Sequence, residues 1–204
     1  QYNFFFPFDL GKFFPEKAKV RFSVTYSYSQ QISNPKYNLL DEDVLLSDAL
    51  DAAETKKQKD SIKNIAQDLV VNKSFTMSNV KVGITSKKPM PYDPSNFSVS
   101  YAYSETDSKN PTTERAVEQN YKGSFVYDYS WNPKPVEPFA KIQKLQQPAW
   151  QFIRDLNFYY APNKISFNTS MSRYYYEQQL RDLTDEGSVN LLEPSFEKDF
   201  TWNT

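Results

Sequence analysis

Hydrophobic and polar residues alternate regularly along three separate segments of the chain. In residues 20–29, VRFSVTYSYS, large apolar or aromatic side chains occupy every even position and polar side chains occupy every odd position. The alternation returns in 97–104, FSVSYAYS, and in 124–131, SFVYDYSW. Because successive side chains of a β-strand point to opposite faces, each segment predicts a strand with one aromatic face and one mostly small, polar face.

Seven strands are predicted along the chain, after an opening strand-like stretch at Tyr2–Phe6. Their ranges are Lys19–Ser29, Ser74–Val82, Asn96–Ser104, Tyr121–Trp131, Asp155–Ala161, Lys164–Tyr176 and Phe196–Asn203. Long polar connections are expected between them, among them a charged loop over 104–119. A strand of about nine residues is roughly 30 Å long. A tilt of about 40° lowers its height to roughly 23 Å, close to the apolar band of an outer-membrane barrel.

One hairpin is predicted in detail. Pro162–Asn163 has the composition of a tight turn. A hairpin around this turn pairs the range 155–161 with 164–176 and sets Phe158 opposite Phe167, so that apolar residues meet on one face.

A helical insertion is predicted between the first two full strands, within residues 38–70. Two apolar stripes there have helical spacing. They consist of Leu46, Ala49, Leu50 and Ala53, and of Ile62, Ile65, Ala66 and Leu69. A polar joint at 55–59 separates them, and Asp41 or Asp43 is expected to cap the start. We expect two short amphipathic helices or one bent helix that packs on the protein's own wall; docking of a partner is the alternative.

Composition excludes several classes of function. The chain of 204 residues has no His, no Cys and only four Gly, and its net charge is −1. The commonest general base and metal ligand is therefore missing, no glycine-rich phosphate loop is present, and no basic surface for nucleic acid is expected. Acidic clusters occur at 41–43 and 185–186, and the first of them lacks the glycine turn of a calcium loop. No catalytic residue, cofactor or metal site is predicted, and an enzyme is the least favoured class.

No stretch reaches the 18 apolar residues of a membrane-spanning helix, so a helical membrane protein is excluded. Two architectures built from strands remain. One is the wall of a transmembrane β-barrel, for which an aromatic content of 17% suits the girdles at membrane interfaces. The other is a soluble extracellular β-sandwich that binds carbohydrate through exposed aromatic residues. A barrel that is a small-solute receptor or porin is a third possibility. The polar positions favour the barrel over the sandwich, because they are rich in serine, which suits a wide aqueous lumen, rather than in the Lys, Glu and Thr of a sandwich's outer face.

Five longer runs resemble the SprA/Sov family of gliding-motility and secretion proteins. They are Asn34–Leu50, Lys59–Asp68, Asn96–Glu114, Tyr121–Phe139 and Leu156–Leu183. The resemblance implies an outer-membrane translocon of the type IX secretion system in Bacteroidota, a very large β-barrel through which folded cargo crosses the outer membrane. It also implies partners: secreted cargo, a PorV-type barrel protein and a plug protein. The family protein is far longer, so we expect the 204 residues to be an internal slice of one barrel domain.

In the expected all-β, antiparallel barrel wall with a helical insertion, each candidate residue takes its role from the face that it occupies. The residues expected to face lipid are Phe22, Val24, Phe97, Val99, Phe125 and Phe167. Those expected to form the interface girdles are Tyr26, Tyr28, Tyr101, Tyr103, Tyr129 and Trp131. Those expected to line the aqueous lumen are Arg21, Ser23, Ser98, Ser100, Ser124 and Ser170.

Overall fold

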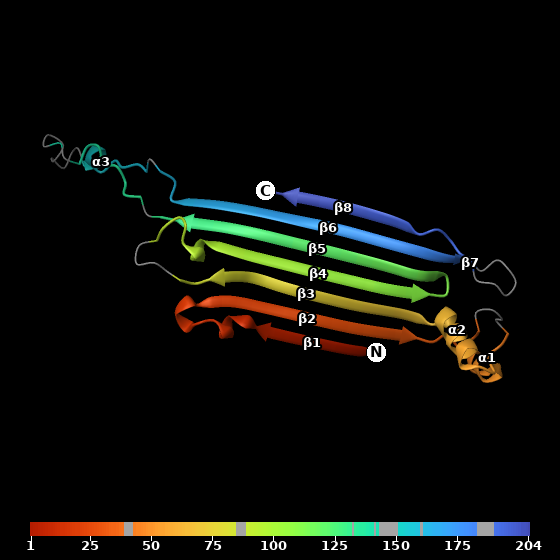
Figure 1. The fold of residues 1–204 in the computed structure, drawn as a ribbon. Coiled ribbons are helices and arrows are strands. Elements are labelled where there is room, and N and C mark those ends of the chain that lie inside the picture. Colours follow the sequence, from red (N-terminus) through yellow and green to blue (C-terminus); the bar gives the residue numbers. More distant parts are fainter. Residues whose placement is uncertain are drawn as a thin grey trace.

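The chain forms one antiparallel sheet of eight strands, in which β1 to β7 follow one another in sequence order and β8 pairs with β6 (Figure 1). The computed structural model describes residues 1–38, 43–84, 89–131, 133–140, 142, 151–159, 161–182 and 190–204. The strands are β1 (Tyr2–Asp9), β2 (Val20–Ser33), β3 (Asp68–Val82), β4 (Phe97–Asn110), β5 (Thr113–Ser130), β6 (Lys164–Asp182), β7 (Asn190–Leu191) and β8 (Ser195–Asn203). The predicted all-β class is confirmed.

Three α-helices and three short 3-10 helices complete the described structure. They are α1 (Leu46–Ala52), α2 (Lys56–Ala66), α3 (Gln151–Arg154), η1 (Leu10–Phe13), η2 (Glu16–Ala18) and η3 (Pro94–Asn96). Helices α1 and α2 confirm the helical insertion between β2 and β3. They are separate because Thr55 and Gln58 form a reciprocal capping box that starts α2. Leu45, not Asp43, is the N-cap residue of α1, and Asp41 lies outside the described residues.

Helix α2 is tied to the end of the sheet by one buried cation. The Arg181 side chain is 1% exposed and pairs with Glu114 at 2.6 Å. Its guanidinium also donates to the backbone carbonyls of Asn110, at 2.8 Å, and of Asn64 and Ile65, both at 3.4 Å. Arg181 thus joins the last turn of α2 to the β4–β5 turn.

Strands β4 and β5 extend beyond their predicted limits, and the predicted charged loop over 104–119 is wrong. The two strands continue to a tight turn, in which the Asn110 side chain accepts the backbone N–H groups of Thr112 at 3.0 Å and Thr113 at 2.8 Å. The charged residues of this region are compatible with strand structure because they pair across the sheet, as Lys73 does with Glu105 at 2.8 Å.

The predicted hairpin at Pro162–Asn163 is also wrong. Strand β6 pairs with β5, which sets Phe167 opposite Tyr127. Within 155–161 the described residues form no strand, and Phe158 makes only an isolated bridge to Val136. Strands β5 and β8 take the two edges of β6, and Phe158 instead bridges Val136, in the segment that follows β5.

A β-bulge in β3 keeps the two faces of the sheet in register. The pairing of β3 shifts between Met77 and Val80, and Asn79 adopts a positive φ of 49°. Asn tolerates this left-handed conformation better than other non-glycine residues, and the Asn79 N–H donates to Ser100 Oγ at 2.9 Å. As a result Met77 and Val80 both remain on the face that carries the aromatic residues.

The sheet is a single layer. Figure 1 shows the described α-helices at the ends of the strands, not stacked over the faces of the sheet. Few apolar residues of the described chain are buried; they are Val24, Leu46, Ala66, Ala116 and Val117. The sandwich alternative requires a second sheet over the aromatic rings, and the described residues form one path of paired strands without such a layer.

Candidate functional site

The register places the aromatic residues of neighbouring strands in rows that cross the sheet on one side, here called the aromatic face. One row contains Phe6, Tyr26, Phe75, Tyr103, Tyr121, Arg173 and Phe200. The next row contains Phe8, Val24, Met77, Tyr101, Gly123, Met171 and Trp202. Directly opposed residues of paired strands share a face, so the aromatic sides of all these strands coincide.

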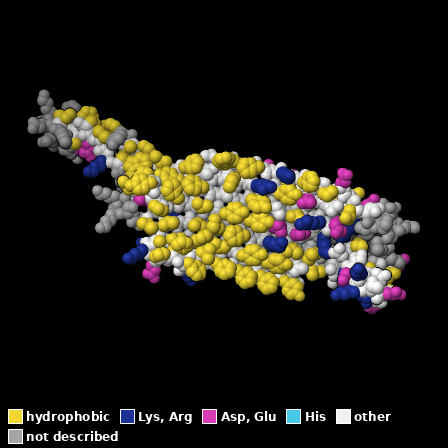
Figure 2. Space-filling view, viewed as in Figure 1, with side chains coloured by type: hydrophobic (Ala, Val, Ile, Leu, Met, Phe, Trp, Pro, Cys, Tyr) yellow, Lys and Arg dark blue, Asp and Glu magenta, His cyan; other side chains and the backbone are white. Residues whose placement is uncertain are grey.

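Part of the aromatic face is predominantly apolar, and we call this part the apolar zone. It extends along the strands from the row of Tyr129 and Ile165 to the row of Tyr103 and Tyr121. Rings contact across strands within it: the Phe97 and Tyr127 centroids are 5.1 Å apart. The zone remains open to its surroundings, since Phe167 is 45% exposed and Trp202 is 68% exposed. Figure 2 shows the hydrophobic side chains gathered there.

The height of the apolar zone fits a membrane. Residues 121 to 129 of β5 span roughly 27 Å of strand, which is roughly 21 Å in height at a tilt of about 40°. The apolar band of an outer-membrane barrel is about 25 Å tall.

Tyrosine hydroxyls at both borders point away from the apolar zone. At the border nearer α2, Tyr103 donates to Glu105 at 2.6 Å and Tyr121 donates to Gln119 at 3.0 Å. One row further out, Tyr28 donates to Gln30 and Tyr175 donates to Glu177. At the opposite border, Tyr127 and Tyr129 donate to the carbonyls of Pro91 and Pro89, and Trp131 stacks on Tyr129 at 5.3 Å. Rings with an apolar body and a polar tip are arranged in this way at membrane interfaces.

Beyond the Tyr103 row the aromatic face carries charged residues, and we call this part the charged zone. Figure 2 shows the cations and anions gathering toward the end where α1 and α2 lie. At its centre Glu105 accepts hydrogen bonds from Lys73, Tyr103 and Gln119. The bonds from Lys73 and Tyr103 lower the pKa of Glu105 to about 2, and the same contact raises the pKa of Lys73.

This network has a defined pH dependence. Because the pKa of Glu105 is lowered on folding, its contribution to stability is present above the ordinary value of about 4.5 and is lost as the pH falls toward about 2. The ion pair therefore persists at neutral pH, and the charged zone stays polar beside the apolar zone.

The opposite side of the sheet, here called the polar face, carries mostly small polar side chains. One row contains Ser100, Ser124, Ser170 and Asn203. Another contains Ser27, Ser74, Ser104 and Asn120, and continues to Phe5 at one end and to Tyr174 and Asp199 at the other. The Ser27 and Ser74 hydroxyls bond to each other at 2.7 Å. Charges are sparse behind the apolar zone: between 121 and 130 of β5 they are Lys122 and Asp128, and Asp128 pairs with Lys164 at 2.9 Å.

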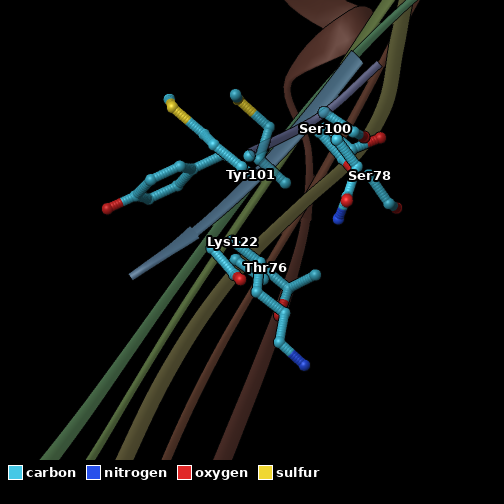
Figure 3. A pocket seen from close by; sticks show the side chains of 13 residues that line it. Thr76, Ser78, Ser100, Tyr101 and Lys122 are labelled. Atoms are coloured by element: carbon cyan, nitrogen blue, oxygen red, sulfur yellow. The ribbon is translucent and has the colours of Figure 1, made fainter. Parts of the chain in front are cut away.

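The division between the two faces is visible at a hollow of about 250 Å³ in the middle of the sheet. Figure 3 shows Tyr101 on one side of the strands and Thr76 and Lys122 on the other. Side chains that are neighbours in sequence, such as Ser100 and Tyr101, are thus separated by the thickness of one sheet.

The register places the residues predicted to face lipid on the aromatic face. Val24, Phe97, Val99, Phe125 and Phe167 lie in rows of the apolar zone. Phe22 lies where the β2–β3 register shifts opposite the bulge.

The predicted girdle residues occupy both borders of the apolar zone. Tyr26 and Tyr103 lie in the border row near the charged zone, with Tyr28 one row outside it and Tyr101 one row inside it. Tyr129 and Trp131 lie at the opposite border.

The residues predicted to line the lumen lie on the polar face. They are Arg21, Ser23, Ser98, Ser100, Ser124 and Ser170. The charged zone could not be predicted from the sequence, because its alternation is not between apolar and polar residues. The contacts of Arg181 could not be predicted either. Within the described ranges no group of acidic residues is arranged to hold a metal ion, and residues 185–186 lie outside those ranges.

Comparison with protein families yields one partial match. Residues 1–50 match the SprA N-terminal family model, described as a motility related/secretion protein. The match covers β1, β2 and the start of the helical insertion. Comparison with curated proteins finds no match. By this match, the N-terminal part of the chain is similar to a family related to motility and secretion.

None of the helices in the described residues is both long and apolar enough to span a bilayer.

Proposed function

We propose that the chain forms part of the wall of an outer-membrane β-barrel through which secreted proteins pass. The aromatic face lies against lipid and the polar face lines the lumen. The observation that carries the proposal is the exposed apolar zone of a single-layer sheet. A soluble protein rarely leaves so large an apolar surface uncovered, whereas lipid covers such a surface along the outside of a barrel.

The tyrosine borders and the family match support the same proposal. The hydroxyls of Tyr103, Tyr121, Tyr127 and Tyr129 all point away from the apolar zone, as expected if water or headgroups lie on both sides of it. Lipid cannot satisfy the backbone groups of an open strand edge, so the proposal requires further strands beside the outer edges of β1 and β8.

The proposed mechanism is passive. Small hydroxyl side chains leave the lumen wide and wet, and their sparse charge gives a passing protein few groups to bind. A porin or receptor for a small solute requires the opposite, a lumen with charged groups placed to bind that solute. On this proposal direction and energy come from elsewhere, and the partners implied by the family resemblance are secreted cargo, a PorV-type barrel protein and a plug protein.

Cross-linking to a transported protein tests this proposal. The chain contains no Cys, so single cysteines can replace Ser98, Ser124 or Ser170 in the complete protein. With export arrested by a cargo fused to a domain too wide for the lumen, we expect a thiol-reactive cross-linker to join the cargo to these positions.

Cysteines at the neighbouring positions Val99 and Phe125 are the matched controls, since they differ only in the face that they occupy. We expect no cargo adduct from either control. Adducts from the controls and none from the serine positions would show that cargo passes on the other side of the sheet.

A further inference from the structure

The apolar zone contains a gap at Gly123. Gly123 lies in a row between Tyr101 and Met171, and all three border a hollow of about 390 Å³. The hollow is bordered by apolar groups that include Phe125 and Trp202. Such a hollow is suited to a flexible hydrocarbon chain, and a side chain at Gly123 would occupy it: a Cβ there would lie 3.3 Å from Met171 Cε.

Two cations lie on the same face, on the side of the hollow toward the charged zone. Arg173 is two residues along β6 from Met171, and its guanidinium lies 5.5 Å from the Tyr121 ring centroid. Lys198, on the adjacent strand β8, lies 5.7 Å from the Tyr175 ring centroid. Since Arg173 is opposite Phe200 and Lys198 is opposite Tyr175, the two cations are diagonal neighbours with Cα atoms roughly 7–8 Å apart.

Their positive charge is available to a ligand. Among the described residues, neither Arg173 nor Lys198 forms an ion pair with a carboxylate. Glu177, the acidic residue next along this face of β6, accepts the Tyr175 hydroxyl at 2.8 Å. Tyrosine rings orient both cations, so less side-chain freedom is lost when they bind an anion.

We propose that this part of the aromatic face binds a phospholipid of net negative charge, with an acyl chain in the Gly123 hollow and the phosphate at Arg173 and Lys198. The proposal rests on the proposed function, since it requires the aromatic face to meet lipid. The order of the groups supports it: the hollow lies inside the apolar zone, Arg173 lies in its border row and Lys198 lies one row further out. A phospholipid has its hydrocarbon, interface and phosphate in the same order.

Trp202 borders the hollow and provides the probe. The complete protein is reconstituted into phosphatidylcholine vesicles and its tryptophan fluorescence is recorded. The fluorescence of Trp202 is the difference between the emission of the parent and that of a Trp202→Phe variant. We expect phosphatidylglycerol with brominated acyl chains to quench this signal at a lower mole fraction than brominated phosphatidylcholine does. The preference is the ratio of the mole fractions of the two brominated lipids that give equal quenching. Each replacement of Arg173 or Lys198 by Gln should lower this ratio about fivefold, and the double replacement should abolish the preference.

Two further variants separate the hollow from the charge. Lys122→Gln removes a cation from the polar face and should leave the preference unchanged. Gly123→Leu fills the hollow and should weaken quenching by brominated phosphatidylglycerol while both cations remain.

Each alternative outcome has a distinct meaning. Equal quenching by the two brominated lipids in the parent would overturn the lipid site and leave the proposed barrel wall intact. Absence of quenching by either lipid would overturn both proposals, because a protein partner would then cover this face. An equal loss of the preference in sodium chloride and in sodium phosphate of the same ionic strength would show that the two cations act only as diffuse surface charge, and would overturn the assignment of a phosphate site.

Discussion

Val99→Lys is expected to prevent assembly of the protein in the outer membrane. Val99 lies inside the apolar zone between Val80 and Phe125 and is 40% exposed. If lipid covers this zone, the substitution places an ammonium group in hydrocarbon, at a cost of about 2–4 kcal/mol near the midplane. The measurement is the amount of folded, protease-resistant protein recovered from outer membranes.

Ser98→Lys is the matched control, since it introduces the same side chain at the adjacent position of β4 on the polar face. If that face lines water, the control should assemble like the parent protein. Equal loss of assembly in both variants would indicate an effect on strand β4 itself, and normal assembly of Val99→Lys would contradict contact between Val99 and lipid.

Arg181→Gln is expected to release helix α2 from the end of the sheet. The substitution leaves Glu114 without its cation and removes the donor that joins the carbonyls of Asn64, Ile65 and Asn110. Breaking a buried ion pair costs about 3–5 kcal/mol, and we expect the lower end because the Glu114 side chain is 35% exposed. Amide hydrogen exchange in α2 should accelerate by about two orders of magnitude.

Arg115→Gln provides the comparison for this loss. Arg115 carries the same side chain on β5, but it is 61% exposed and its contact with Asp107 is long, at 3.9 Å. Its removal should change stability by no more than about 0.5 kcal/mol. Unchanged exchange in α2 after Arg181→Gln would mean that other contacts hold the helix.

The faces of β2, β4 and β5 could be predicted from sequence because their apolar and polar positions contrast sharply. This contrast excludes a register shift by one residue, since such a shift would exchange the two faces. The contrast disappears where Leu69, Val70 and Val71 follow one another in β3, and where Glu105 and Asp107 take the aromatic-face positions of β4. The strand limits were therefore predicted too short at this end of the sheet.

Pairing between distant segments could not be predicted from local signals. Pro162–Asn163 has the composition of a turn, but turn composition does not choose between a short partner beside it and the long β5 strand. Gly123 and Arg181 show the same limit. Each acquires its meaning from residues far away in sequence: Gly123 from Tyr101 and Met171 beside it, and Arg181 from the α2 carbonyls that it binds.

The medium at each face of β4 can be measured directly with nitroxide labels at single cysteines through residues 97–104 of the complete protein in a lipid bilayer. We expect collision with oxygen, which concentrates in hydrocarbon, to peak at the odd positions. Collision with a water-soluble nickel chelate should peak at the even positions. The opposite phase, or odd positions shielded from both reagents, would contradict a wall that separates lipid from water.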